Sequence, residues 1–227
     1  MIEFYTWFTP NGRKVAIMLE ETGIEYTTHS VNIGKDEQFD PAFLKIAPNN
    51  KIPAIVDTDN NNYPLFETGA ILLYLAEKEG RFLGPKSPGD RGELLSWLMF
   101  VASGIGPYSG QAVHFQHHAP DKLPYAINRY RFEAQRHYDI LNAHLGDRPY
   151  MLGDDYSIVD MAVWGWARLV PFILSEEEAG AMVNLKRLVD EISARPAAGR
   201  AIAIKDRHAF KAEMDEEARR NMFPSNY

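Results

Sequence analysis

Three short segments carry side chains suited to binding an anion or a peptide-like ligand. The first is Phe8-Thr9-Pro10-Asn11-Gly12, where a hydroxyl and an amide precede an apolar helical pattern. Free backbone amides and the helix dipole stabilise an anion at such a position. We therefore expect Thr9 and Asn11 to stabilise an anion, and a thiolate would suit them. An ordinary turn and helix cap explains the same two residues.

The second segment is Lys51-Ile52-Pro53-Ala54, in which a proline stands at the start of a predicted strand. A cis peptide bond before Pro53 would turn the amide and carbonyl of Ile52 outward, ready to pair with an extended ligand. Only ~5% of X-Pro bonds are cis. Taken alone, the segment favours a trans proline at a strand edge.

The third segment is Phe66-Glu67-Thr68-Gly69-Ala70, where an acidic residue and a hydroxyl residue open a helical pattern. Thr68 and the nearby amides would accept a carboxylate, and Glu67 would pair with an ammonium group. Together they would bind an α-amino acid zwitterion. A threonine N-cap preceded by a surface glutamate is the alternative.

The elements that must position these segments follow from the hydrophobic periods of residues 1–80. Strands alternate with helices in the order β-α-β-α-β-β-α, which is typical of an α/β domain. The expected strands are Ile2–Thr6, Tyr26–Ile33, Ala54–Val56 and Tyr63–Phe66, and the expected helices are Asn11–Glu21, Phe43–Ile46 and Gly69–Glu79. All three segments lie at junctions of these elements, so we expect them to converge.

A proline- and glycine-rich stretch at 84–89 predicts a domain boundary, which gives domains of 1–84 and 88–227. Helical periods at 91–103 and 125–145 predict an all-helical second domain. Ser157 and Asp160 form a capping-box pattern before a buried helix expected over 161–172. The charged segment 205–221 is expected to be helical, with no function indicated.

Composition excludes several classes of protein. The sequence contains no cysteine, so any sulfur chemistry must use a bound thiol. A net charge of -7 and a pI near 5.5 argue against nucleic acid and membrane surfaces as partners. The first residues lack the pattern of a secretory signal, and no apolar run reaches the ~20 residues of a membrane span. We expect a cytoplasmic protein.

Three histidines, His114, His117 and His118, stand close together and raise the question of a metal site. A helix would place His114 and His118 on one face and His117 to its side, and no cysteine completes the set. We therefore expect no metal and favour a structural or pocket role. Four aromatic residues are candidates for an apolar second-substrate pocket: Trp7, Phe8, Tyr108 and Phe115.

In combination and order, these motifs resemble the glutathione S-transferase family. The resemblance rests on Thr-Pro-Asn-Gly, Asn-Asn-Lys-Ile-Pro-Ala-Ile-Val and Phe-Glu-Thr-Gly-Ala-Ile-Leu-Leu-Tyr-Leu-Ala-Glu, together with the capping box. It covers all but the segment after about residue 205. Within the family the likeness is to the Nu class of bacterial glutathione-dependent disulfide-bond reductases, carried by four segments: Gly106-Pro107, Gly110-Gln111, His114-Phe115 and 124–130.

The resemblance implies a homodimer with a thioredoxin-like N-terminal domain that binds glutathione. Thr9 and Asn11 would address the sulfur, and Ile52, before Pro53, would pair with the cysteinyl unit. Glu67 and Thr68 would hold the γ-glutamyl end. The remaining implied contacts are Gln38 and Lys51 near the glycine carboxylate, and Arg129 reaching the ligands from the neighbouring subunit.

The favoured activity is reduction of small-molecule disulfides with two glutathione molecules, or one glutathione disulfide, per site. Transfer of glutathione to an electrophile and reduction of an organic peroxide remain open, because both use the same thiolate. A binding protein of this fold without turnover is the third possibility. Tyr5 falls inside the first strand, which favours a core or dimer-facing role over thiolate activation.

Overall fold

The computed structural model describes residues 1–85, 87–208, 210 and 215–224. Its contacts form two compact units, one of Met1–Leu75 with Pro196–Tyr227 and one of Ala76–Arg195. The last helices therefore group with the first unit. The division into domains of 1–84 and 88–227 stays a prediction.

A four-stranded sheet in the order β2-β1-β3-β4 organises the first unit. The strands are β1 (Ile2–Thr6), β2 (Tyr26–Ser30), β3 (Ala54–Asp57) and β4 (Tyr63–Phe66). β1 runs parallel to β2 and antiparallel to β3, and β3 is antiparallel to β4. β2 is shorter than predicted, because the Asn32 side chain accepts the amide of Gly34 and starts a 3₁₀ turn there.

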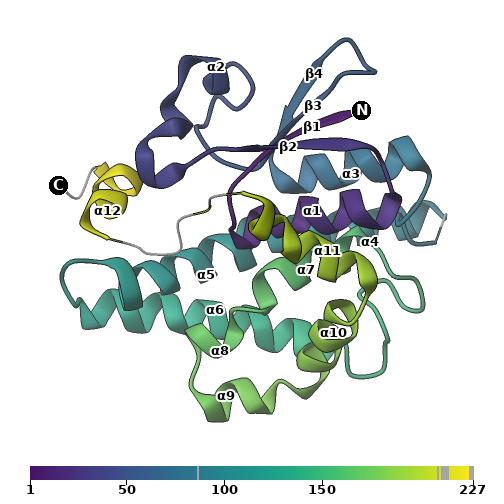
Figure 1. Cartoon of the computed structure of the whole chain (residues 1–227). Helices are drawn as coiled ribbons and strands as arrows, with labels where there is room; N and C mark the ends of the chain where they lie inside the picture. The colour runs from purple at the N-terminus through teal and green to yellow at the C-terminus, as the bar shows by residue number, and fades with distance from the viewer. Residues whose placement is uncertain (86, 209, 211–214, 225–227) are drawn as a thin grey trace. The chain divides into compact units, whose positions relative to one another are not determined.

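Helices cover both faces of this sheet. Figure 1 shows α1 and α3 on one face and α2 on the other. α1 ends at Gly23, which has φ 75° and donates its amide to the Leu19 carbonyl. The helices of this unit are α1 (Pro10–Thr22), η1 (Ile33–Lys35), η2 (Glu37–Phe39), α2 (Pro41–Leu44), α3 (Thr68–Glu79), α11 (Pro196–Ala203), η5 (Ile204–Arg207) and α12 (Glu216–Met222). The last turn of α3, from Ala76, is assigned to the second unit.

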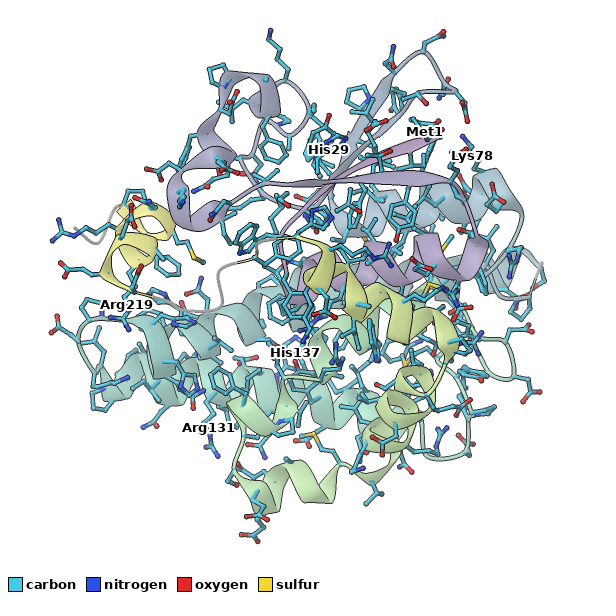
Figure 2. The ribbon with its side chains drawn as sticks, viewed as in Figure 1. Met1, His29, Lys78, Arg131, His137 and Arg219 are labelled. Carbon is cyan, nitrogen blue, oxygen red and sulfur yellow. The ribbon has the colours of Figure 1, made fainter. Side chains whose placement is uncertain are left out.

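The second unit is helical, as predicted. Its elements are α4 (Pro88–Phe100), α5 (Gly106–Val113), α6 (Pro124–His144), α7 (Ile158–Ala167), α8 (Val170–Ile173), α9 (Glu176–Ala181), α10 (Val183–Ser193) and the π-helical turns η3 (Val101–Ile105) and η4 (His114–His118). His137 lies in the interior of this unit, 5% exposed and stacked on Phe100 at 5.1 Å (Figure 2). A Cβ at Gly104 would lie 2.5 Å from the His137 ring, so this contact requires glycine.

Every residue of α7 is buried, and its capping box is formed as expected. The buried Asp160 carboxylate accepts the amide of Ser157 at 2.8 Å. The prediction that this helix continues to Phe172 is wrong, because it ends at Ala167. Pro171, which lacks an amide hydrogen, lies in the first turn of a separate helix, α8.

The predicted fold class, an α/β unit with an all-α unit, is confirmed by this sheet and these helices. Within the described residues, no helix combines the length and the apolar character needed to cross a membrane.

Candidate functional site

The strand register brings the three predicted segments to one end of the sheet. Tyr5 pairs with Ala54, and Ala54 pairs with Phe66 on its other side. The end of β1, the start of β3 and the end of β4 therefore lie together. Residues 7–12, 51–53 and 67–68 continue directly from these strand ends, so the predicted convergence is observed.

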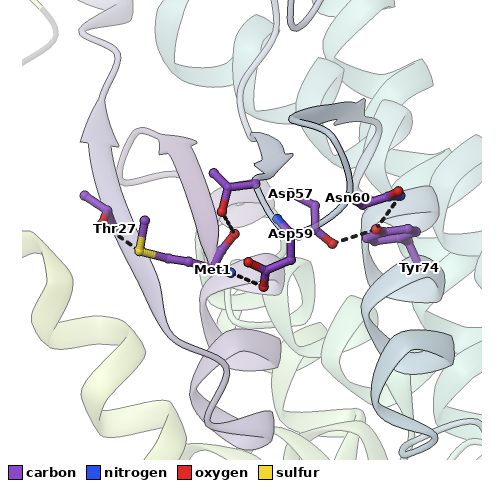
Figure 3. Close-up of polar contacts among 7 residues, drawn as sticks. Met1, Thr27, Asp57, Asp59, Asn60 and Tyr74 are labelled. Carbon is purple, nitrogen blue, oxygen red and sulfur yellow. Dashed lines mark hydrogen bonds and ion pairs between the residues drawn. The ribbon is translucent and has the colours of Figure 1, made fainter.

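The opposite end of the sheet is closed by polar contacts (Figure 3). The Tyr74 hydroxyl donates to the buried carboxylate of Asp57 at 2.6 Å, and Asn60 donates to Tyr74 at 3.2 Å. Thr58 donates its hydroxyl to the Met1 carbonyl at 2.9 Å. These groups bond to one another, and the ligand-type segments are all at the other end.

Thr9 is the N-cap of α1. Its hydroxyl oxygen accepts the amide of Gly12 at 3.1 Å, which leaves the hydroxyl hydrogen able to donate to a ligand. Asn11 lies in the first turn and is half-buried. A Cβ at Gly12 would lie 2.5 Å from both Thr6 Oγ1 and the Trp7 carbonyl oxygen, so glycine is needed for this close approach of helix to strand.

Tyr5 lies inside β1, as expected. Its ring stacks on His29 at 4.7 Å and is tilted against Phe43 at 6.2 Å. Burial, with the charge of Glu3, raises the pKa of its hydroxyl. A tyrosine with a raised pKa is less acidic than usual, which does not favour a role as the group that activates a thiol.

The Ile52–Pro53 peptide bond is cis. Ile52 is half-buried against the cluster of Val31, Phe43, Ala47 and Ala54. Its backbone forms no hydrogen bond with the described part of the chain. Lys51 is exposed beside it.

At the end of β4, Glu67 has φ 69° and accepts the Ile71 amide on its carbonyl oxygen. α3 thus begins at Thr68, one residue earlier than predicted, with Glu67 as the capping position. The Glu67 side chain is exposed and Thr68 is half-buried.

Lys14 is a residue of this site that the sequence analysis missed. It lies on α1 and is 2% exposed. Burial lowers the pKa of its ammonium group to about 7, and the charge of Glu67 opposes this shift. The sequence does contain a signal for this residue, because a lysine stands on the apolar face of a predicted helix and lysines are seldom buried.

Gln38 is buried in η2 and contacts the C-terminal helix α12. Its Nε2 donates to the Asn221 carbonyl at 3.3 Å, and its Oε1 is buried with no hydrogen-bond partner among the described residues. Asn221 Nδ2 in turn donates to the Gly34 carbonyl at 2.7 Å. No motif in the sequence predicted that 216–222 contacts this predicted site residue.

Arg129 belongs to the helical unit, on α6. Its Nη1 donates to Glu133 Oε1 at 2.6 Å, and its side chain is 52% exposed. Hydrogen bonds from Arg136 and the charge of Arg129 lower the pKa of the Glu133 carboxyl group. A reach of Arg129 into a neighbouring subunit stays a prediction.

The three histidines lie in the π-helical turn η4, and burial lowers the pKa of His114. His117 Nε2 lies 3.0 Å from the Phe172 carbonyl oxygen. Within the described residues, no group of three or more His, Cys, Asp or Glu could hold a metal ion. Trp7 and Phe8 contact Phe210 in the first unit, whereas Tyr108 and Phe115 belong to the second, so their common pocket stays a prediction.

Comparison with known proteins identifies the family. Residues 1–77 match the N-terminal domain of glutathione S-transferases, and residues 124–178 match the C-terminal domain. The disulfide-bond oxidoreductase YfcG of Escherichia coli (strain K12) is 42% identical over 221 residues, which cover 96% of this chain and 98% of YfcG. The chain belongs to the glutathione S-transferase family. The predicted resemblance to bacterial disulfide-bond reductases of this family is confirmed.

Two solved structures of glutathione transferases have a similar fold. One, from Pseudomonas fluorescens pf-5 with two glutathione bound, is 41% identical with a TM-score of 0.82, covering 88% of this chain and 92% of that one. The other, from Pseudomonas putida with one glutathione disulfide bound per subunit, is 38% identical with a TM-score of 0.82, covering 89% and 91%.

Proposed function

We propose that this glutathione S-transferase family member is a glutathione-dependent disulfide-bond oxidoreductase. The observation that carries the proposal is the meeting of three ligand-type segments at one end of the sheet of a chain with no cysteine. The similarity to YfcG and to structures with two glutathiones or glutathione disulfide supports it.

The residues at this end of the sheet fit the tripeptide. Glu67 offers a carboxylate to the γ-glutamyl ammonium group, and Thr68 offers a hydroxyl at the start of α3 to its carboxylate. The amide and carbonyl of Ile52, beside Pro53, are available to the cysteinyl unit. The orphan Oε1 of Gln38 and the exposed Lys51 are polar groups for the glycyl end.

Glutathione supplies the reducing thiol as a substrate. Thr9 and Asn11 each donate one hydrogen bond to the sulfur anion, and neither is a base at neutral pH. An unperturbed thiol has a pKa of ~8.5. Two hydrogen bonds to an anion, at about 1.5 kcal/mol each, lower it by about two units, since one unit is ~1.36 kcal/mol. A pKa near ambient pH suits disulfide exchange.

The electron balance requires two thiols. Reducing one disulfide to two thiols takes two electrons, and this chain has no cysteine to supply them. Two glutathione molecules are therefore oxidised to one glutathione disulfide per turnover. We propose a homodimer in which Arg129 reaches the ligands of the neighbouring subunit, and a cytoplasmic location, where glutathione is abundant and reduced.

Glutathione-dependent reduction of hydroxyethyl disulfide by the purified protein tests the proposal. We expect turnover that depends on Thr9 and Asn11. Transfer to a chlorinated aromatic electrophile and reduction of an organic hydroperoxide are measured in parallel, because the same thiolate could serve both. If neither reaction nor disulfide reduction occurs while calorimetry shows glutathione binding, the chain is a binding protein and the proposed activity is wrong.

A further inference from the structure

A cavity of about 450 Å³ opens in the helical unit between the C-terminal end of α7 and helices α8, α9 and α10. Figure 1 labels these four helices in the helical unit. Ligand pockets commonly have volumes of ~300–1,000 Å³. Much of the surface around it is aliphatic, including the buried side chains of Val170, Met182 and Leu185. None of the segments of the proposed glutathione site contributes to it.

Arg168 lines this cavity, and no described carboxylate pairs with it. Its guanidinium lies over the indole of Trp164 at 4.8 Å, and its Nη1 is buried without a hydrogen bond in the described part of the chain. Arg168 also forms no ion pair with any described residue. Burial lowers the pKa of Arg168. A buried guanidinium donor without an acceptor is costly, because it has lost water and gained no hydrogen bond in return.

The other charges around the cavity are accounted for. Lys186 forms an ion pair with Asp190 one turn further along α10, so the Asp190 carboxylate already has a cationic partner other than Arg168. Glu176 is exposed in the first turn of α9. The indole under Arg168 is held in place, since Trp164 Nε1 donates to Ser193 Oγ at 2.9 Å.

We propose that this cavity is a second binding site, for an organic monocarboxylate with an apolar body. The carboxylate accepts hydrogen bonds from Arg168, and the apolar body occupies the aliphatic surface of α8, α9 and α10. An aromatic or aliphatic acid fits both the volume and the single unpaired cation. The site acts independently of the disulfide chemistry proposed for the sheet.

Calorimetry on the full chain with naphthoate and with its neutral amide tests this site. We expect naphthoate to bind at one site, at least about tenfold more tightly than the amide, because only the acid forms charge-assisted hydrogen bonds. Arg168→Gln should reduce naphthoate binding to the level of the amide. Disulfide reduction should be unchanged, and saturating glutathione should not displace naphthoate.

A second variant keeps the test decisive if Arg168→Gln fails to fold. Gly180 on α9 lines the cavity, and a Cβ there meets nothing within 4 Å, so Gly180→Leu can place an apolar side chain at the cavity wall. Gly199 on α11 is an equally exposed helical glycine with open space, which makes Gly199→Leu the matched control. Binding should be lost in the first and kept in the second. Naphthoate binding that survives Gly180→Leu, or is abolished by glutathione, or is absent in the unaltered protein overturns the proposal.

Discussion

The Thr9 hydroxyl has two tasks in the proposed mechanism, and they can be separated by substitution. It accepts the Gly12 amide as the cap of α1, and it donates its hydrogen to the glutathione sulfur. Thr9→Ala removes both, whereas Thr9→Ser keeps both. If Thr9→Ala loses activity and Thr9→Ser keeps it, the loss is therefore caused by removal of the hydroxyl.

Thr9→Ala and Asn11→Ala should each lower disulfide reductase activity by about 10- to 150-fold, the equivalent of ~1.5–3 kcal/mol per charged hydrogen bond. The pKa of the bound thiol rises in both variants, so their pH-rate profiles should shift upward and activity should partly recover in alkaline buffer. Tyr5→Phe should change little. If the pH-rate profile were unshifted in both alanine variants and Tyr5→Phe were inactive, Tyr5 in β1 would be the residue that activates the thiol.

The buried position of Lys14 predicts that the free energy of unfolding rises with pH. Its pKa is about 7 when folded and near 10.4 when unfolded, so between these values the unfolded chain binds more protons. Its contribution to the free energy of unfolding should increase by up to about 1.4 kcal/mol per pH unit above pH 7. Urea unfolding at several pH values should show a flatter rise in Lys14→Met than in Lys45→Met, which removes an exposed lysine. If the free energy of unfolding rose equally steeply with pH in the two variants, the lowered pKa of Lys14 would be contradicted.

Three of the candidate segments could be placed from the sequence because each lies within a few residues of a strand end, whereas Gln38 and Arg129 do not. Once the strand order is known, the positions of Thr9, Ile52 and Glu67 follow from the register. Lys14 was missed because periodicity marks a helical face and says nothing about which charged residue is buried on it. The charge that opposes the shift of its pKa is that of Glu67, which lies 53 positions away in the sequence.

At the scale of elements, two Ser-x-x-Asp capping boxes among the described residues have different surroundings. The one at α4 uses Ser87 and Asp90 and is exposed or partly exposed. The one at α7 uses Ser157 and Asp160, both fully buried, and Asp160 also accepts the amide of Met151 at 2.8 Å. The same motif should therefore contribute differently to stability.

Asp160→Ala should destabilise the protein by about 3 kcal/mol or more, because three buried donors lose their acceptor at ~1–3 kcal/mol each. Asp90→Ala should cost only about 0.5–1.5 kcal/mol, because it removes one exposed hydrogen bond from the Ser87 amide. Urea denaturation of the two variants provides the comparison. Equal losses would mean that burial adds nothing to the motif.

Burial also raises the pKa of Asp160 to about 6 when folded, against the opposing hydrogen bonds. Its contribution to stability should therefore fall as pH rises from about 4 to 6. The box itself was predictable, because a capping motif is local. The break after Ala167 was missed because the apolar pattern continues through Pro171 without a change of period.

At the scale of the whole molecule, one face of α6 supports the proposed dimer. Tyr125 is 85% exposed and Phe132 is 59% exposed, and both share a helical face with Arg129 at spacings of four and three residues. Exposed aromatic residues beside an arginine are typical of the centre of a protein interface. Such a face is expected to be covered by a second copy of the chain.

Sedimentation should show a dimer at micromolar concentration, and Phe132→Asp should shift it toward monomer. Val183→Asp replaces another exposed apolar residue, 62% exposed on α10, and should leave the dimer intact. Disulfide reductase activity should fall with dimer content, because each proposed site needs Arg129 from its neighbour. A fully active monomer would remove Arg129 from the site.

The last helices belong to the first unit, so this unit can be completed only at the end of translation. α11 packs on α1, where Arg200 donates to the Glu20 carbonyl at 3.0 Å, and α12 contacts Gln38. The ribosome makes the sheet first and must then make residues 76–195 before α11 exists. At ~5–20 residues per second, those 120 residues take about 6–24 s. During that time the nascent first unit lacks its final helices, and the surface of α1 that α11 covers is open to chaperones.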